Sequence, residues 1–158
     1  MAPDSGLTRA LMEDRALALG EAVETGPPPL GPGAPPRERL TAFLDAVVDV
    51  VGRSKGLMAA IGHAMSTAPQ PPEEQAESHP VYRAWHGHAS RLIAEERPDA
   101  DADVLAHLLL AALHSAPVLA MIQGEAPRVA AALRTLAAAL LDAPPDGAPG
   151  TTAGGAGP

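Results

Sequence analysis

The sequence contains no cysteine and has only one phenylalanine, one tyrosine and one tryptophan among its 158 residues. Without cysteine the chain has no disulfide, no thiolate zinc site and no cysteine nucleophile. Because aromatic residues are so scarce, the hydrophobic core must be built from Leu, Val and Ala. Ala and Leu are strong helix formers, and β-branched residues are sparse. The composition therefore predicts a single, all-α domain.

Positive charge is also scarce, since 11 Lys and Arg face 19 Asp and Glu for a net charge of −8. Proteins that hold nucleic acid through its phosphates usually present a basic patch, and no Lys/Arg cluster is present here. No apolar run approaches the roughly 20 residues of a membrane span, and the first residues, MAPDSGLTRA, lack a secretory signal pattern. We therefore expect a cytoplasmic protein without a membrane partner. No nucleophile-elbow serine or Gly-rich phosphate loop occurs, so we expect no enzyme.

Proline and glycine divide the chain into four parts. Residues 1–25 are predicted to form a linking helix, and the sequence GPPPLGPGAPP at 26–36 is a Pro/Gly linker. Residues 37–142 form the helical core. The low-complexity tail at 143–158 has too few apolar residues to join a core, and we expect it to be disordered.

The apolar periodicity predicts an antiparallel bundle of about six helices. Their approximate ranges are 6–25, 37–53, 55–67, 80–96, 101–123 and 125–142. The second helix is the clearest, because its apolar residues form one stripe at helical spacing: Leu40, Phe43, Leu44, Val47, Val48 and Val51. The fifth is apolar nearly all round, and Pro117 is expected to kink it near Leu113.

The last two predicted helices carry more apolar surface than a monomer of this size can cover. The sixth has leucines and a valine at nearly heptad spacing, which is typical of a helix–helix seam. We therefore expect a homodimer in which these two helices pack against their copies. The candidate interface residues are Leu109, Leu113, Val129, Leu133, Leu136 and Leu140.

Three stretches resemble a known family in helix lengths, turns and apolar pattern. They are RERLTAFLDAVVDVVGRSKGLMAAIG, VYRAWHGHASRLIAEERPDADADVLAHLLLAAL and IQGEAPRVAAALRTLAAALL, and they lie within residues 37–142. Together they resemble the C-terminal regulatory half of TetR-type transcriptional repressors. The resemblance implies effector binding and dimerisation.

In that family a helix-turn-helix unit precedes the linking helix, and the present sequence starts where that unit would stop. We therefore expect DNA binding only if an N-terminal helix-turn-helix is supplied. The alternative is a stand-alone helical adaptor that dimerises with an intact regulator and binds no ligand.

The resemblance also implies a cavity for a small apolar or amphipathic effector, enclosed by the second to the fifth predicted helices. The candidate wall residues are Met58, Ile61, Met65, Trp85, His88 and His107. The 81/85/88/92 spacing turns Trp85 and His88 toward the bundle, where an imidazole would supply one hydrogen bond among apolar walls. Methionine and tryptophan at helical spacing are also typical of an ordinary packed core, so this alternative stays open.

Six histidines raise the question of a metal site. His107 and His114 are seven residues apart, which separates them by about 10 Å along a helix, too far to chelate one ion. His86 and His88 are two residues apart and point to different sides of their helix. No His-x-x-x-His or His-x-x-Glu pair is present, so we expect no metal and no cofactor.

Overall fold

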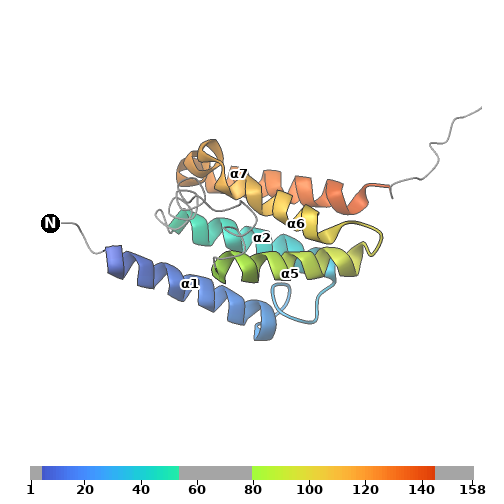
Figure 1. The fold of residues 1–158 in the computed structure, drawn as a ribbon, viewed down its shortest axis with the longest axis horizontal. Coiled ribbons are helices and arrows are strands. Elements are labelled where there is room, and N and C mark those ends of the chain that lie inside the picture. The colour runs from blue at the N-terminus through green and yellow to red at the C-terminus, as the bar shows by residue number, and fades with distance from the viewer. Residues whose placement is uncertain (1–4, 54–79, 145–158) are drawn as a thin grey trace, which may run out of the picture.

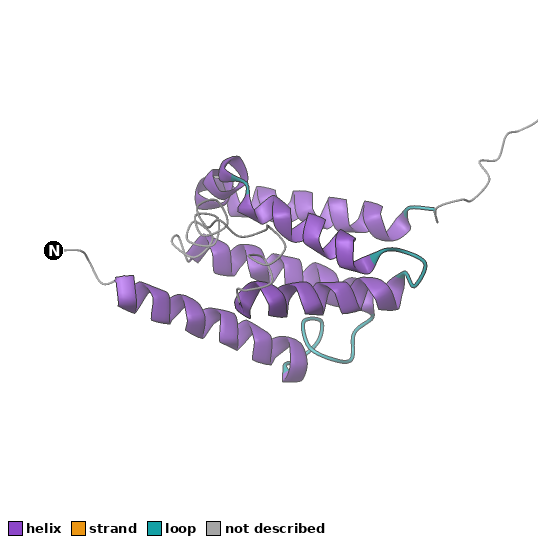
Figure 2. Ribbon diagram, in the orientation of Figure 1, coloured by secondary structure: helices purple, strands orange, loops and turns teal. Residues whose placement is uncertain are grey.

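The computed structural model describes residues 5–53 and 80–144, and within these ranges every regular element is a helix (Figure 2). The elements are α1 (Ser5–Thr25), α2 (Pro36–Arg53), α5 (Pro80–Glu96), α6 (Ala102–Ala111), the short 3₁₀ helix η1 (Ala112–His114) and α7 (Ala116–Asp142). The all-α prediction is confirmed for this part of the chain. The predicted helix at 55–67, with Met58, Ile61 and Met65, lies outside the described residues, as does the tail from residue 145 onward.

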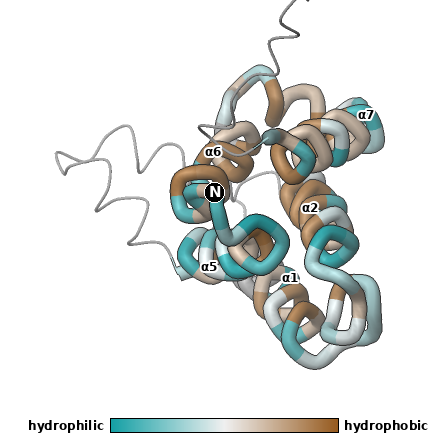
Figure 3. Tube along the Cα trace, turned by 90° about the vertical axis from the view of Figure 1, so that its right-hand side faces the viewer, coloured by the Kyte–Doolittle hydropathy of each residue, from teal (hydrophilic) through white to brown (hydrophobic). Residues whose placement is uncertain are grey.

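Helix α2 lies at the centre of the bundle and contacts α1, α5 and α7 (Figure 1). The view in Figure 3 shows it between α7 and α1, with much of its trace in the colour of apolar residues. All six residues of its predicted stripe are buried, and so is Val50. Since neighbours cover α2 on several sides, its buried surface is wider than one stripe.

Helix α1 packs on the outside of α2 and α5, where Leu19 and Val23 are buried. Arg39 of α2 donates a hydrogen bond from Nη2 to the backbone carbonyl of Val23 at 2.8 Å. This carbonyl belongs to the last turn of α1, where backbone acceptors have no partner inside the helix. In the following loop, a Cβ at Gly31 would lie 1.8 Å from the carbonyl oxygen of Gly26, so only glycine fits there.

The predicted helix at 101–123 is wrong as a single element. Helix α6 ends at Ala111, one turn of 3₁₀ helix follows, and Ser115 is extended at φ −68° and ψ 130°. Pro117 does not kink a helix interior but sits in the first turn of α7, where its missing N–H leaves no hydrogen bond unmade. The break falls near Leu113 as expected, but it ends the helix instead of bending it.

Helix α7 bends at Glu125, whose backbone (φ −138°, ψ 46°) is not helical, and Pro127 follows two residues later. The expected boundary between the fifth and sixth helices therefore falls at this bend. Beyond it, α7 packs on α2 and buries a stripe made of Val129, Leu133, Ala137 and Leu141.

No single helix of the described ranges combines the length and hydropathy of a membrane span. Helices α6 and α7 reach these values only as a pair, and that pair is bent by 67°.

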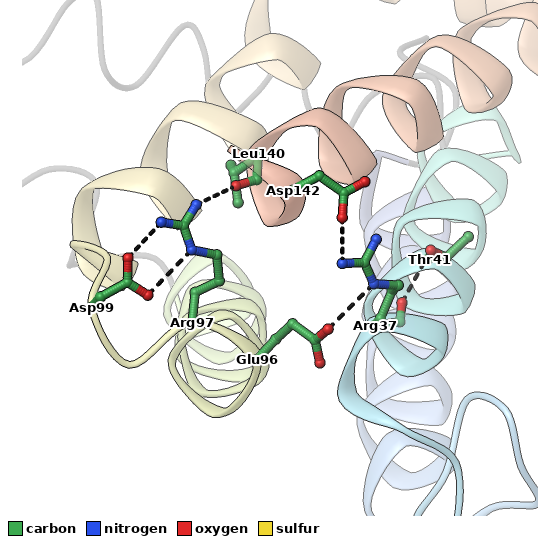
Figure 4. Close-up of polar contacts among 7 residues, drawn as sticks. All are labelled: Arg37, Thr41, Glu96, Arg97, Asp99, Leu140 and Asp142. Atoms are coloured by element: carbon green, nitrogen blue, oxygen red, sulfur yellow. Dashed lines mark hydrogen bonds and ion pairs between the residues drawn. The ribbon is translucent and has the colours of Figure 1, made fainter. Parts of the chain in front are cut away.

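Two arginines join the ends of three helices by polar contacts (Figure 4). Arg37, in the first turn of α2, binds Glu96 of α5 at 3.3 Å and Asp142 of α7 at 2.7 Å. Arg97, directly after α5, binds both carboxylate oxygens of Asp99 and donates from Nη1 to the carbonyl of Leu140 at 3.0 Å. These contacts fix the end of α7 against α2 and α5.

We predict that Arg97→Met destabilises the domain by about 1–2 kcal/mol, because the substitution removes a nearly buried guanidinium together with its charge-assisted hydrogen bonds. Arg37→Met is the matched control and should cost less, since its side chain is more exposed to water and screening. Chemical denaturation followed by the fluorescence of Trp85, the only tryptophan, measures both changes. Equal losses in the two variants would contradict this ranking.

Candidate functional site

The buried face of α5 carries both the aromatic and the histidine that the sequence singled out. Trp85 and His88 are 4% and 7% exposed, so the predicted inward orientation of both side chains is confirmed. Ala89 and Leu92 complete the face, which packs on α2. Apart from Tyr82 and Trp85, His88 is the only residue with a polar side chain that is buried in the described part of the chain.

The imidazole of His88 lies among apolar groups. Its ring contacts Phe43 of α2 edge-on, with the ring centroids 4.9 Å apart. Its Nε2 atom is buried and has no hydrogen-bond partner among the described residues. Burial, together with the smaller effect of the positive charges of Arg39 and Arg91, lowers the pKa of His88 to about 4. The side chain is therefore neutral near pH 7.

Arg39 places a second unsatisfied polar atom in this region. Its Nη2 caps the carbonyl of Val23, but its Nε is buried without a partner within the described ranges. The guanidinium is close enough to His88 for its charge to disfavour protonation of the imidazole. The interface of α1, α2 and α5 thus contains two buried polar atoms that have no hydrogen-bond partner within residues 5–53 and 80–144, and such atoms are rare in proteins.

His107 does not lie with Trp85 and His88 as the predicted cavity wall requires. The structure places it on the outer side of the α5–α6 pair, where it is half-buried and stacks on His86 with ring centroids 3.8 Å apart. His86 and His88 are two residues apart, about 200° around the helix, so they face opposite sides of α5. The predicted place of His107 on the cavity wall is therefore corrected. The register of α6 turns Ala106, Leu109 and Leu110 inward instead.

A cluster of four side chains forms on this outer side. Tyr82 and His86 are four residues apart on α5, and Asp103 and His107 are four residues apart on α6. His86 Nε2 lies 3.2 Å from Asp103 Oδ1, His107 Nε2 lies 3.9 Å from the same oxygen, and Tyr82 Oη is hydrogen-bonded to His107 Nδ1 at 2.8 Å. One ligand atom from each of His86, Asp103 and His107 lies within 4.8 Å of the others, so these residues are able to hold a metal ion.

Sequence reasoning missed this cluster because it looked for two metal ligands on one helix. The spacing of Asp103 and His107 was a visible signal, since residues four apart share a helix face. The second histidine, His86, comes from the neighbouring helix α5. The register between α5 and α6 cannot be predicted from the sequence of either helix alone. Tyr82 was likewise not among the predicted site residues.

The candidate dimer residues fall into two groups. Leu109, Leu113, Val129 and Leu133 are buried in the core of their own chain, so they do not form a surface for a partner. Leu136 is 49% exposed and Leu140 is half-buried. The heptad-like spacing was therefore assigned to the wrong contact, because half of the seam packs on α2 within the chain. Exposed apolar side chains also occur on α6, at Val104 and Leu108.

Comparison with known proteins finds no family model, no curated protein and no solved structure that is significantly similar to this chain.

We predict that the stability of the domain falls as the pH is lowered from about 6.5 toward 4. In this window the unfolded chain protonates His88, but the folded chain does not, so unfolding takes up a proton. The expected contribution is about 1.4 kcal/mol per pH unit, and it is fully present above the unfolded pKa.

His88→Leu and His88→Gln differ in polarity but both lack the titrating group, so both should show the same flatter profile. Urea denaturation at a series of pH values measures the slopes. If both variants retain the slope of the original protein, His88 is not its source.

Proposed function

We propose that this chain is an effector-sensing, dimerising regulatory domain of the kind found in the C-terminal half of TetR-type repressors, which its sequence resembles. Such a domain acts in the cytoplasm and contacts DNA only through an attached helix-turn-helix. The effector is a small amphipathic molecule with an apolar body and a hydrogen-bond-accepting head group.

The observation that carries this proposal is the pair of unsatisfied buried atoms, His88 Nε2 and Arg39 Nε. A buried polar group without a partner costs about 1–3 kcal/mol, so it needs a compensating role. An acceptor such as a carboxylate would receive a hydrogen bond from the guanidinium and from the imidazole, in the tautomer that carries its proton on Nε2. The apolar surroundings formed by residues such as Phe43 and Trp85 would favour the rest of the molecule.

Arg39 also gives a physical route from the effector to α1. The same guanidinium that faces the proposed head group holds the last turn of α1 through the carbonyl of Val23. An effector that draws Arg39 toward itself would weaken this hydrogen bond and change the position of α1. In the proposed architecture α1 is the helix that links to a DNA-binding unit. The coupling requires that the effector binds one arrangement of α1 more tightly than the other.

Dimerisation through the exposed face of α7 completes the proposal, with a second copy of the chain as the partner. Leu136 is large, apolar and half exposed, and it lies beside the stripe of α7 that packs on α2. The exposed alanines on α7 would let two such helices approach closely. These residues are Ala131, Ala132, Ala138 and Ala139.

We predict that medium-chain fatty acids raise the melting temperature and change the fluorescence of Trp85, and that the matching primary alcohols and amines do so less. The carboxylate would satisfy both buried atoms, whereas an ammonium group would face the charge of Arg39. His88→Leu and Arg39→Met should each weaken acid binding about tenfold or more, since each removes one charge-assisted hydrogen bond.

Arg83→Met is the control, because Arg83 is an exposed arginine on α5, the helix that carries His88. Tighter binding of the amine than of the acid would overturn the assigned head group. If no member of the series binds and the chain still dimerises, the proposed sensing role fails and the adaptor role is favoured.

We predict that the chain is a dimer at micromolar concentration and that Leu136→Glu weakens the dimer on the order of 100-fold, because the interface would bury an unpaired charge. Leu17→Glu is the matched control, since Leu17 is 66% exposed on α1, away from α7 in the contacts of the bundle. Light scattering across a dilution series measures both, and circular dichroism checks that they fold. A wild-type monomer at these concentrations would refute the dimer.

A further inference from the structure

We propose that His86, Asp103 and His107 form a binding site for a divalent transition-metal ion, with Zn²⁺ as the best-suited ion, on the outer side of the α5–α6 pair. This inference is independent of the effector proposal, because the two regions lie on opposite sides of α5. It rests on the geometry of the cluster and on the hydrogen bond that orients one of its rings.

The two helices bring the ligands together by matched spacing. Tyr82 and His86 are one turn apart on α5, and Asp103 and His107 are one turn apart on α6. Tyr82 meets His107 and His86 meets Asp103, which is the order expected where two helices run antiparallel. All three ligands therefore belong to regular helices, which hold side chains more firmly than a loop does.

The distances are close to those that a tetrahedral ion requires. Ligand atoms at 2.0–2.1 Å from zinc are about 3.4 Å apart. His86 Nε2 and His107 Nε2 lie 3.2 and 3.9 Å from Asp103 Oδ1. The Asp103 carboxylate is 70% exposed, so an ion would reach it directly from water, and solvent would fill the fourth position.

Tyr82 supplies an outer contact of the kind that metal-binding histidines usually have. A histidine that ligates a metal through one ring nitrogen commonly donates the N–H of the other to a fixed acceptor. His107 is placed to do this, because Nε2 faces Asp103 while Nδ1 lies 2.8 Å from the hydroxyl of the buried Tyr82, which accepts its N–H in the tautomer protonated on Nδ1. With the proton on Nδ1, the lone pair of Nε2 is directed away from Tyr82 and is available to the ion.

The ligand types choose among ions. Two imidazoles and one carboxylate suit Zn²⁺ and its neighbours in the first transition row, whereas Mg²⁺ and Ca²⁺ prefer oxygen ligands alone. His86 Nε2 also lies 3.0 Å from the backbone carbonyl of Asp103, to which it donates when it carries the proton. Metal binding would move that proton to Nδ1 and replace this hydrogen bond by the metal–nitrogen bond. The ion would then join α5 to α6 and stabilise their pairing.

Titration of the full chain with Zn²⁺ by calorimetry tests the site, with Mg²⁺ as the control ion. We expect one Zn²⁺ per chain, a melting temperature that rises with Zn²⁺, and no binding of Mg²⁺. Asp103→Asn and His107→Gln should each abolish most of the affinity. Tyr82→Phe should weaken binding about tenfold, because it removes only the outer hydrogen bond.

Glu95→Gln is the matched control for the loss of one exposed carboxylate on the same pair of helices, and it should bind as the unchanged chain does. A second measurement needs no variant: imidazole nitrogen resonances of His86 and His107 should shift on addition of Zn²⁺, and those of His88 should not. Binding that survives in a His86→Gln, His107→Gln double variant, or Zn²⁺ shifts confined to other histidines, would overturn the site.

Discussion

The structure depends on the burial of α2 between its neighbours. Leu44 and Val47 have no exposed surface, and α1, α5 and α7 all pack on this one helix. A helix covered on several sides must be apolar over most of its circumference, and α2 satisfies this requirement with Leu40, Phe43, Leu44 and four buried valines. Leu, Val and Ala make up most of the core, and all three aromatic residues, Phe43, Tyr82 and Trp85, are buried in it as well.

Apart from Asp45, which pairs with Arg134 of α7, the polar contacts from α2 to its described neighbours lie near its ends. Near its start, Arg37 reaches the ends of α5 and α7, and Arg39 reaches the end of α1. Hydrogen bonds of this kind specify where a helix ends against its neighbours, which apolar contacts do not, because the latter are not directional. His88 departs from this rule, since it faces the middle of α2 through Phe43 and not its end.

Helix α5 separates two environments with different chemistry. Its inner face holds a neutral imidazole with a pKa of about 4, near the half-buried guanidinium of Arg39, whose Nε is buried. On its outer face, His86 stacks on His107 of α6 and meets the water-exposed carboxylate of Asp103. The inner groups favour an organic ligand with an acceptor and an apolar body, whereas the outer groups favour a cation. A change on either face would act on the same helix, which packs on both α2 and α6.

The sequence by itself determined the helical class, the buried stripe of α2 and the inward direction of Trp85 and His88, because these follow from composition and from the 3.6-residue period. It did not determine that Leu133 packs on α2 and not on a partner, since the spacing of apolar residues does not identify the surface against which they pack. It also did not reveal that His86 meets Asp103 and His107. That meeting depends on the register between α5 and α6, which only the packed tertiary structure decides.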